Sequence, residues 1–136
     1  MSSSSAQDLA YALLRVTLGV NFFVHGLVRL PDVAGFAQGV AGSFEGTLLP
    51  VALALPFAYA IPIVELIAGG LLIVGLFTKP ALVVLSLLMI GLHFGMAVRQ
   101  EWGVLADQLI YVFLLFVLLY LHREAFSVDS LRERRS

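Results

Sequence analysis

The segment LPVALALPFAYAIPIVELIAGGLLIVGL, residues 49–76, decides the fold, because it contains a single charged side chain, Glu65. About 20 apolar residues in a helix cross the ~30 Å hydrocarbon core of a bilayer. The segment is long enough to do so, and it predicts a transmembrane helix. Pro56 and Pro62 lie inside it and predict a kink or a broken turn there.

Three further apolar runs of similar character surround this segment, at about residues 9–30, 81–98 and 104–121. The sequence therefore predicts an all-α integral membrane protein, with four transmembrane helices bundled into a single domain over residues 1–136. The composition agrees, since 60% of the residues are hydrophobic and 12% are charged, against roughly a quarter charged in soluble proteins. The formal net charge of −1 gives no indication of nucleic-acid binding. Cysteine is absent, which excludes disulfides, thiolate metal ligands and iron–sulfur clusters, and we predict no metal site.

The long connection between the first two spans, residues 31–48, has a helical pattern of its own. Its apolar residues Val33, Phe36, Val40 and Phe44 recur at helical spacing, and Asp32 is a candidate N-cap. This pattern predicts a short amphipathic helix lying on the membrane surface.

The basic residues predict the orientation. With four spans, one side of the membrane carries five Lys or Arg residues, in the 76–80 turn and the C-terminal tail, and the other side carries only Arg29 and Arg99. By the positive-inside rule both termini are expected in the cytoplasm, with the 31–48 connection outside. The N-terminal segment MSSSSAQD has no Lys or Arg, and we expect no cleaved signal peptide.

Two ionisable residues, Arg15 and Glu65, are expected at similar depth in the predicted first and second spans. A charged side chain in hydrocarbon costs at least ~2.5–3.5 kcal/mol on insertion scales, so such residues usually serve a function. Counted from the outer ends of their helices, both lie ~22 Å below the boundary, and we predict that they form a buried ion pair. The alternative is that Arg15 extends to the cytoplasmic interface while Glu65 is protonated.

Three other ionisable residues, His25, His93 and Asp107, fall within about one helical turn of each other in predicted depth. They come from three different spans and lie ~5–9 Å inside the outer boundary. A histidine with a carboxylate partner can relay protons, hydrogen-bond a carbonyl or coordinate a metal. The alternative is that each histidine merely bonds a neighbouring helix and that Asp107 complements a helix dipole. We predict a ligand site in the outer half of the bundle, formed by His25, His93 and Asp107 with Asn21, Arg29 and Gln108 at its edge.

Three stretches together resemble the DoxX family of small four-helix membrane proteins. They are LLRVTLGVNFFVHGLVRL (13–30), PIVELIAGGLLIVGLFTKPA (62–81) and ADQLIYVFLLF (106–116). The positions that match the family pattern are Arg15, Gly19, Gly26, Arg29, Glu65, Gly69 and Gly75. The resemblance implies a four-helix bundle and a link to quinone-coupled redox chemistry, such as thiosulfate:quinone oxidoreduction.

These observations favour a membrane subunit of a quinone-linked oxidoreductase that binds a quinone or a similar small ligand within the bundle. The partners expected are the lipid bilayer and either other redox subunits or further copies of the chain. Three alternatives remain open: a non-enzymatic scaffold or assembly subunit, a small permease or proton-conducting element that uses Arg15 and Glu65, and a haem b protein with His25 and His93 as axial ligands. We expect a multi-pass protein of the bacterial inner (plasma) membrane, with the catalytic residues unassigned.

Overall fold

The computed structural model describes residues 3–136, and within them it contains helices and no strands. Four long helices form the bundle: α1 (Ser3–Arg29), α3 (Val51–Val74), α4 (Thr78–Val98) and α5 (Trp102–Tyr120). Each of the four lies in a segment that is long and apolar enough to span a membrane. The predicted all-α membrane bundle is therefore confirmed, and most helix ends fall within three residues of their predicted positions. The exception is the start of α1, which begins six residues before the predicted first span at Ser3.

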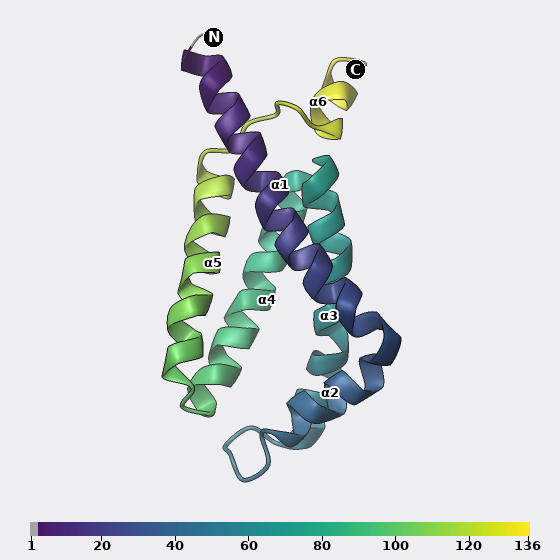
Figure 1. The fold of residues 1–136 in the computed structure, drawn as a ribbon, viewed down its shortest axis with the longest axis vertical. Coiled ribbons are helices and arrows are strands. Elements are labelled where there is room, and N and C mark those ends of the chain that lie inside the picture. The colour runs from purple at the N-terminus through teal and green to yellow at the C-terminus, as the bar shows by residue number, and fades with distance from the viewer. Residues whose placement is uncertain (1–2) are drawn as a thin grey trace.

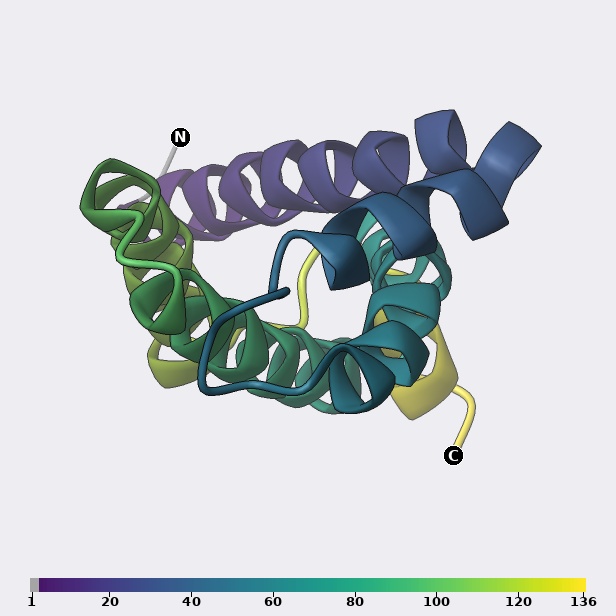
Figure 2. The ribbon, with the colours of Figure 1, turned by 90° about the horizontal axis from the view of Figure 1, so that it is seen from below.

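Two short elements follow α1 without a break in the chain, the 3-10 helix η1 (Leu30–Asp32) and the helix α2 (Val33–Gly42). The side chain of Asp32 caps α2 by accepting a hydrogen bond from the Gly35 nitrogen at 2.8 Å, as the sequence predicts. Helix α2 packs against α3 through its buried residues Ala37 and Ala41. Seen from that end, α2 lies on the α1 and α3 side of the bundle, away from α5 (Figure 2).

The helix α3 is continuous through its two prolines, so the broken turn that the sequence offers as one possibility is not formed. Both Pro56 and Pro62 lie inside the single helix Val51–Val74. Gly75 ends this helix in the left-handed conformation, with φ of 71°, and its nitrogen donates to the Leu71 carbonyl at 2.8 Å. A residue with a Cβ would be strained at this position.

Close packing of α1 on α3 determines which residues of the two helices lie opposite each other. A Cβ added to Gly19 would lie 2.9 Å from the Gly69 oxygen, and one added to Gly26 would collide with the Pro62 carbonyl. Glycines at such positions allow helix backbones to approach within membranes. Gly19 therefore lies opposite Gly69, and Gly26 lies opposite Pro62, about two turns further along.

Helix α1 separates from α5 towards the α2 end of the bundle (Figure 1). Near the chain termini the two helices are joined, because the Tyr11 hydroxyl donates to the Leu118 carbonyl at 2.8 Å. Towards α2, helix α1 runs diagonally to α3, and its few contacts with α5 end near Asn21, Phe22 and Tyr111. The bundle is thus tightly packed along α1 and α3 and more open between α1 and α5.

Candidate functional site

A cavity with a volume of about 460 Å³ lies in the α2 half of the bundle. This size falls within the range of small-molecule sites, roughly 300–1,000 Å³. Five helices contribute to its wall, with α2 closing one end. The lining residues are Asn21, Phe22, His25, Arg29, Phe36, Gly39, Val40, Ser43, Ile61, Glu65, Met89, Leu92, Met96, Arg99, Val104, Gln108 and Tyr111.

An ion pair between Arg29 and Glu65 forms part of this wall. The Arg29 Nη1 atom lies 2.6 Å from Glu65 Oε2, and the side chains are 26% and 6% exposed. The Arg29 guanidinium also stacks on the Phe36 ring of α2, 4.4 Å from its centroid. The pair joins α1 to α3, and the stacked ring holds α2 against it.

His25 lies at the rim of the cavity with one ring nitrogen already bonded. Its Nδ1 atom is 2.7 Å from the Asn21 carbonyl oxygen. Since a carbonyl only accepts, Nδ1 carries the proton, and in the neutral ring Nε2 is then an acceptor. His25 can therefore accept a hydrogen bond from a ligand in the cavity.

Gln108 contributes a second acceptor, from α5. Its Oε1 atom is buried and has no hydrogen-bond partner in the described part of the chain. One turn further along α5, Tyr111 accepts a hydrogen bond from Asn21 Nδ2 at 3.4 Å, which leaves its own hydroxyl proton free to donate. A buried amide oxygen without a partner is costly, and a ligand with an O–H or N–H donor would satisfy it.

The structure places only four of the six predicted ligand-site residues on the cavity. Asn21, His25, Arg29 and Gln108 line it, whereas His93 and Asp107 are not among its lining residues. Asp107 is exposed next to Gln108 because successive residues of a helix point about 100° apart. His93 is half-buried, with an Nδ1 atom that has no partner among residues 3–136. Of the three ionisable groups expected at equal depth, only His25 lines this cavity.

The predicted ion pair between Arg15 and Glu65 is not formed. Both residues are buried, at 1% and 4% exposure, but Arg15 Nε donates to the Leu72 carbonyl at 3.0 Å, seven residues beyond Glu65. The prediction assumed that the end of the first span and the start of the second span lie at the same depth. In the structure the first turns of α3 pack on α2 instead, so α1 meets α3 further along the helix.

The remaining donors of Arg15 hold the C-terminal tail. Its two terminal nitrogens donate to the carbonyls of Ala125 at 3.2 Å and Phe126 at 2.8 Å. The tail then forms a helix that the sequence did not predict, α6 (Val128–Glu133), capped by the Ser127 side chain. A buried arginine is stabilised here by backbone carbonyls, and no acidic partner is needed.

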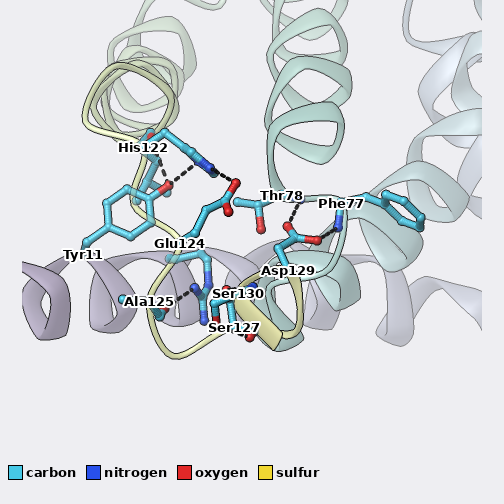
Figure 3. A network of polar contacts seen from close by, with 11 residues as sticks. Tyr11, Phe77, Thr78, His122, Glu124, Ala125, Ser127, Asp129 and Ser130 are labelled. Atoms are coloured by element: carbon cyan, nitrogen blue, oxygen red, sulfur yellow. Dashed lines mark hydrogen bonds and ion pairs between the residues drawn. The ribbon is translucent and has the colours of Figure 1, made fainter. Parts of the chain in front are cut away.

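Polar contacts fix α6 and the chain before it against the turn between α3 and α4 (Figure 3). Both carboxylate oxygens of Asp129 accept backbone N–H groups at 2.9 Å, one from Phe77 and one from Thr78. Burial opposes ionisation of Asp129, but these two N–H groups, the Thr78 side chain and the positive charge of Arg132 together outweigh it and hold its pKa below the ordinary value. His122 lies beside Tyr11 and pairs with Glu124 at 3.2 Å.

Helix α4, from which the sequence predicted His93 as a site residue, lines the cavity through other residues. Met89, Leu92, Met96 and Arg99 recur every three or four residues, which is the spacing of one helix face. That periodicity was visible in the sequence, but it does not distinguish a cavity wall from ordinary core packing. Arg29 was placed at the edge of the predicted site, and its pairing with Glu65 was not anticipated.

The fold and this cavity define a multi-pass membrane protein with a small-molecule-sized cavity inside its helix bundle. The model of the DoxX family matches residues 10–97, about two thirds of the chain. The chain therefore belongs to the DoxX family.

A relative in Bacillus subtilis (strain 168), described as "Putative oxidoreductase CatD", is 37% identical over 86 residues. The alignment covers 62% of this chain and 57% of that protein, so the chain spans less than two thirds of its relative's length. No solved structure gives a significant match.

Proposed function

We propose that this chain is a membrane subunit of a quinone-linked oxidoreductase and that the 460 Å³ cavity binds the quinone ring. The observation that carries the proposal is the pair of acceptors, His25 Nε2 and Gln108 Oε1, on the wall of a largely apolar cavity within the membrane. A quinol has two hydroxyl donors on opposite sides of a flat apolar ring. The two acceptors and the apolar wall suit such a molecule.

The cavity also suits the quinone, which is the oxidised form of the proposed ligand. A quinone accepts two electrons and two protons to become the quinol, so a redox site must bind both states. The Tyr111 hydroxyl can donate to a quinone carbonyl, and the Arg29–Glu65 pair adds local charge without a net charge. His25 lies at the rim, where it can take up a proton from the ring and pass it towards water.

The family and the relative's description support a redox role. Since the chain has no cysteine, no thiol pair of its own can supply electrons, and a partner subunit or a diffusible donor is proposed to do so. From the distribution of Lys and Arg we propose that the α2 end, with the cavity, faces the outside of a bacterial inner membrane. Both termini and α6 then lie in the cytoplasm.

Calorimetric titration of the purified chain in lipid nanodiscs with a short-tailed quinol tests the proposal. Gln108→Leu keeps the volume of the side chain but removes the acceptor, and we expect binding to weaken about tenfold, as for one lost hydrogen bond. Asp107→Asn is the matched control, because the adjacent Asp107 does not line the cavity; it should bind as the wild type does. No binding by the wild type would refute the proposal.

A further inference from the structure

A second cavity of about 190 Å³, lined only by apolar residues, lies between α2, α3 and α4. Three exposed residues, Leu53, Phe57 and Phe94, form the side that faces lipid, and the half-buried Leu49 lies at the end. Deeper in the bundle, its wall includes the buried Ala54 and Gly95. The cavity thus reaches from the lipid-facing surface into the bundle.

Gly91 and Gly95 of α4 allow two aromatic rings to pack against the helix at the wall of this cavity. A Cβ on Gly91 would lie 2.5 Å from the Phe57 ring, and one on Gly95 would lie 3.0 Å from the Phe44 ring. Both glycines lie on one face of α4, one turn apart, so two aromatic rings rest directly on the helix backbone. The rings and the glycines together form a slot with no polar side chain.

This slot adjoins the quinone cavity. Four residues, Val40, Ile61, Leu92 and Met96, line both cavities, so only their side chains separate the two spaces. Met96 is unbranched and has three rotatable bonds, which lets it change shape at low cost. A change in its rotamer would join the polar-lined cavity to the apolar slot.

We infer that the slot holds the hydrocarbon tail of the quinone, which leaves the bundle between α3 and α4 while the ring lies in the 460 Å³ cavity. This inference rests on the proposed function and specifies the substrate class as a quinone with a hydrocarbon tail. Hydrocarbon suits the slot because every lining residue is apolar. The other side of the ring cavity carries the polar groups His25, Arg29 and Gln108 at or near its wall, which favour the ring rather than the tail.

Affinities of short-tailed and long-tailed quinols, measured in nanodiscs, test the inference in a pair of variants. Ala54→Leu fills the slot, and we expect it to weaken binding of the long-tailed quinol on the order of tenfold, as for an overpacked site. The short-tailed quinol should bind as it does to the wild type. Ala68→Leu is the control, because Ala68 is equally buried on α3 and lines a separate apolar cavity nearer the other end of α3; neither quinol should be affected.

Photolabelling uses the wild type, so its result does not depend on whether a variant folds. A quinone carrying a diazirine in its tail should label residues 53–57 and 90–96, and excess unlabelled quinone should abolish the labelling. Labelling confined to α1 and α5, or equal effects of Ala54→Leu on both quinols, would overturn the tail assignment while leaving ring binding intact. Failure of the wild type to bind the short-tailed quinol would instead refute the proposed function.

Discussion

Arg29 and Glu65 show how one ion pair connects three helices in an apolar bundle. Arg29 reaches Glu65 from the last turn of α1 and at the same time stacks on Phe36 of α2. Glu65 is almost fully buried, so it depends on this partner for compensation of its charge. The pair is thus both a structural link and part of the cavity wall.

Loss of Arg29 should expose this dependence. Arg29→Met leaves Glu65 buried without its cation, and we expect a loss of about 2–4 kcal/mol in the free energy of unfolding, measured by denaturation in detergent. Arg99→Met breaks the more exposed pair with Glu101, at 3.3 Å, and should cost less than about 1 kcal/mol. Equal losses in the free energy of unfolding for the two variants would show that burial of Glu65 does not make its ion pair more important for stability.

At the scale of the helix, two adjacent glycines of α3 differ in what surrounds them. A Cβ on Gly69 would collide with the backbone of Phe23 in α1, whereas one on Gly70 would sit 3.6 Å from the Phe23 ring, an ordinary contact. The close approach of α1 and α3 therefore needs a glycine at the first position but not at the second.

The variants Gly69→Ala and Gly70→Ala test this difference directly. Gly69→Ala should force the helices apart and lower stability by about 1–3 kcal/mol. Gly70→Ala should be neutral or stabilising by up to about 1 kcal/mol, since alanine favours helix. Thermal unfolding in the same detergent compares them, and equal melting temperatures would contradict the packing described here.

The C-terminal tail should be held less firmly at low pH. The N–H groups of Phe77 and Thr78 help to lower the folded pKa of Asp129. The stabilisation of the folded tail by ionised Asp129 is therefore complete above the unfolded pKa of about 3.9. This stabilisation is lost as the pH falls through the lower pKa that Asp129 has in the folded state. Asp129→Asn should cost about 1 kcal/mol at neutral pH, as for a lost helix cap.

Hydrogen exchange in residues 122–133 measures this effect. The variant should exchange faster than the wild type at neutral pH, and the difference should disappear in acid, below the folded pKa of Asp129. A difference that persists unchanged at the lowest pH would show that ionisation of Asp129 does not hold the tail.

For the whole molecule, the sequence predicted the fold well because apolar length and turn residues act locally. The bounds of α3 and the Asp32 cap of α2 follow from such signals. The pairing of Arg15 and Glu65 failed because depth counted along each helix ignores how α2 shifts α1 relative to α3. Of two neighbouring residues that the sequence assigned to the ligand site, Gln108 lines the cavity and Asp107 does not, because they point in different directions from α5.

Orientation is a prediction for the molecule as a whole, since it follows from the summed Lys and Arg bias. Because the chain has no cysteine, single introduced cysteines report on accessibility without background. Gly42→Cys in the α2 end should react with a membrane-impermeant maleimide from outside intact cells, and Arg134→Cys should react only after lysis. The reverse pattern would place both termini outside.

The most direct test of quinone binding in this cavity compares the two histidines. His25→Ala removes an acceptor at the rim, whereas His93→Ala removes a histidine of α4 that does not line the cavity. In calorimetric titrations with the short-tailed quinol, we predict that His25→Ala weakens binding about tenfold and that His93→Ala matches the wild type. Weakened binding by His93→Ala alone, or equal affinities of both variants and the wild type, would contradict the assignment of this cavity as the quinone site.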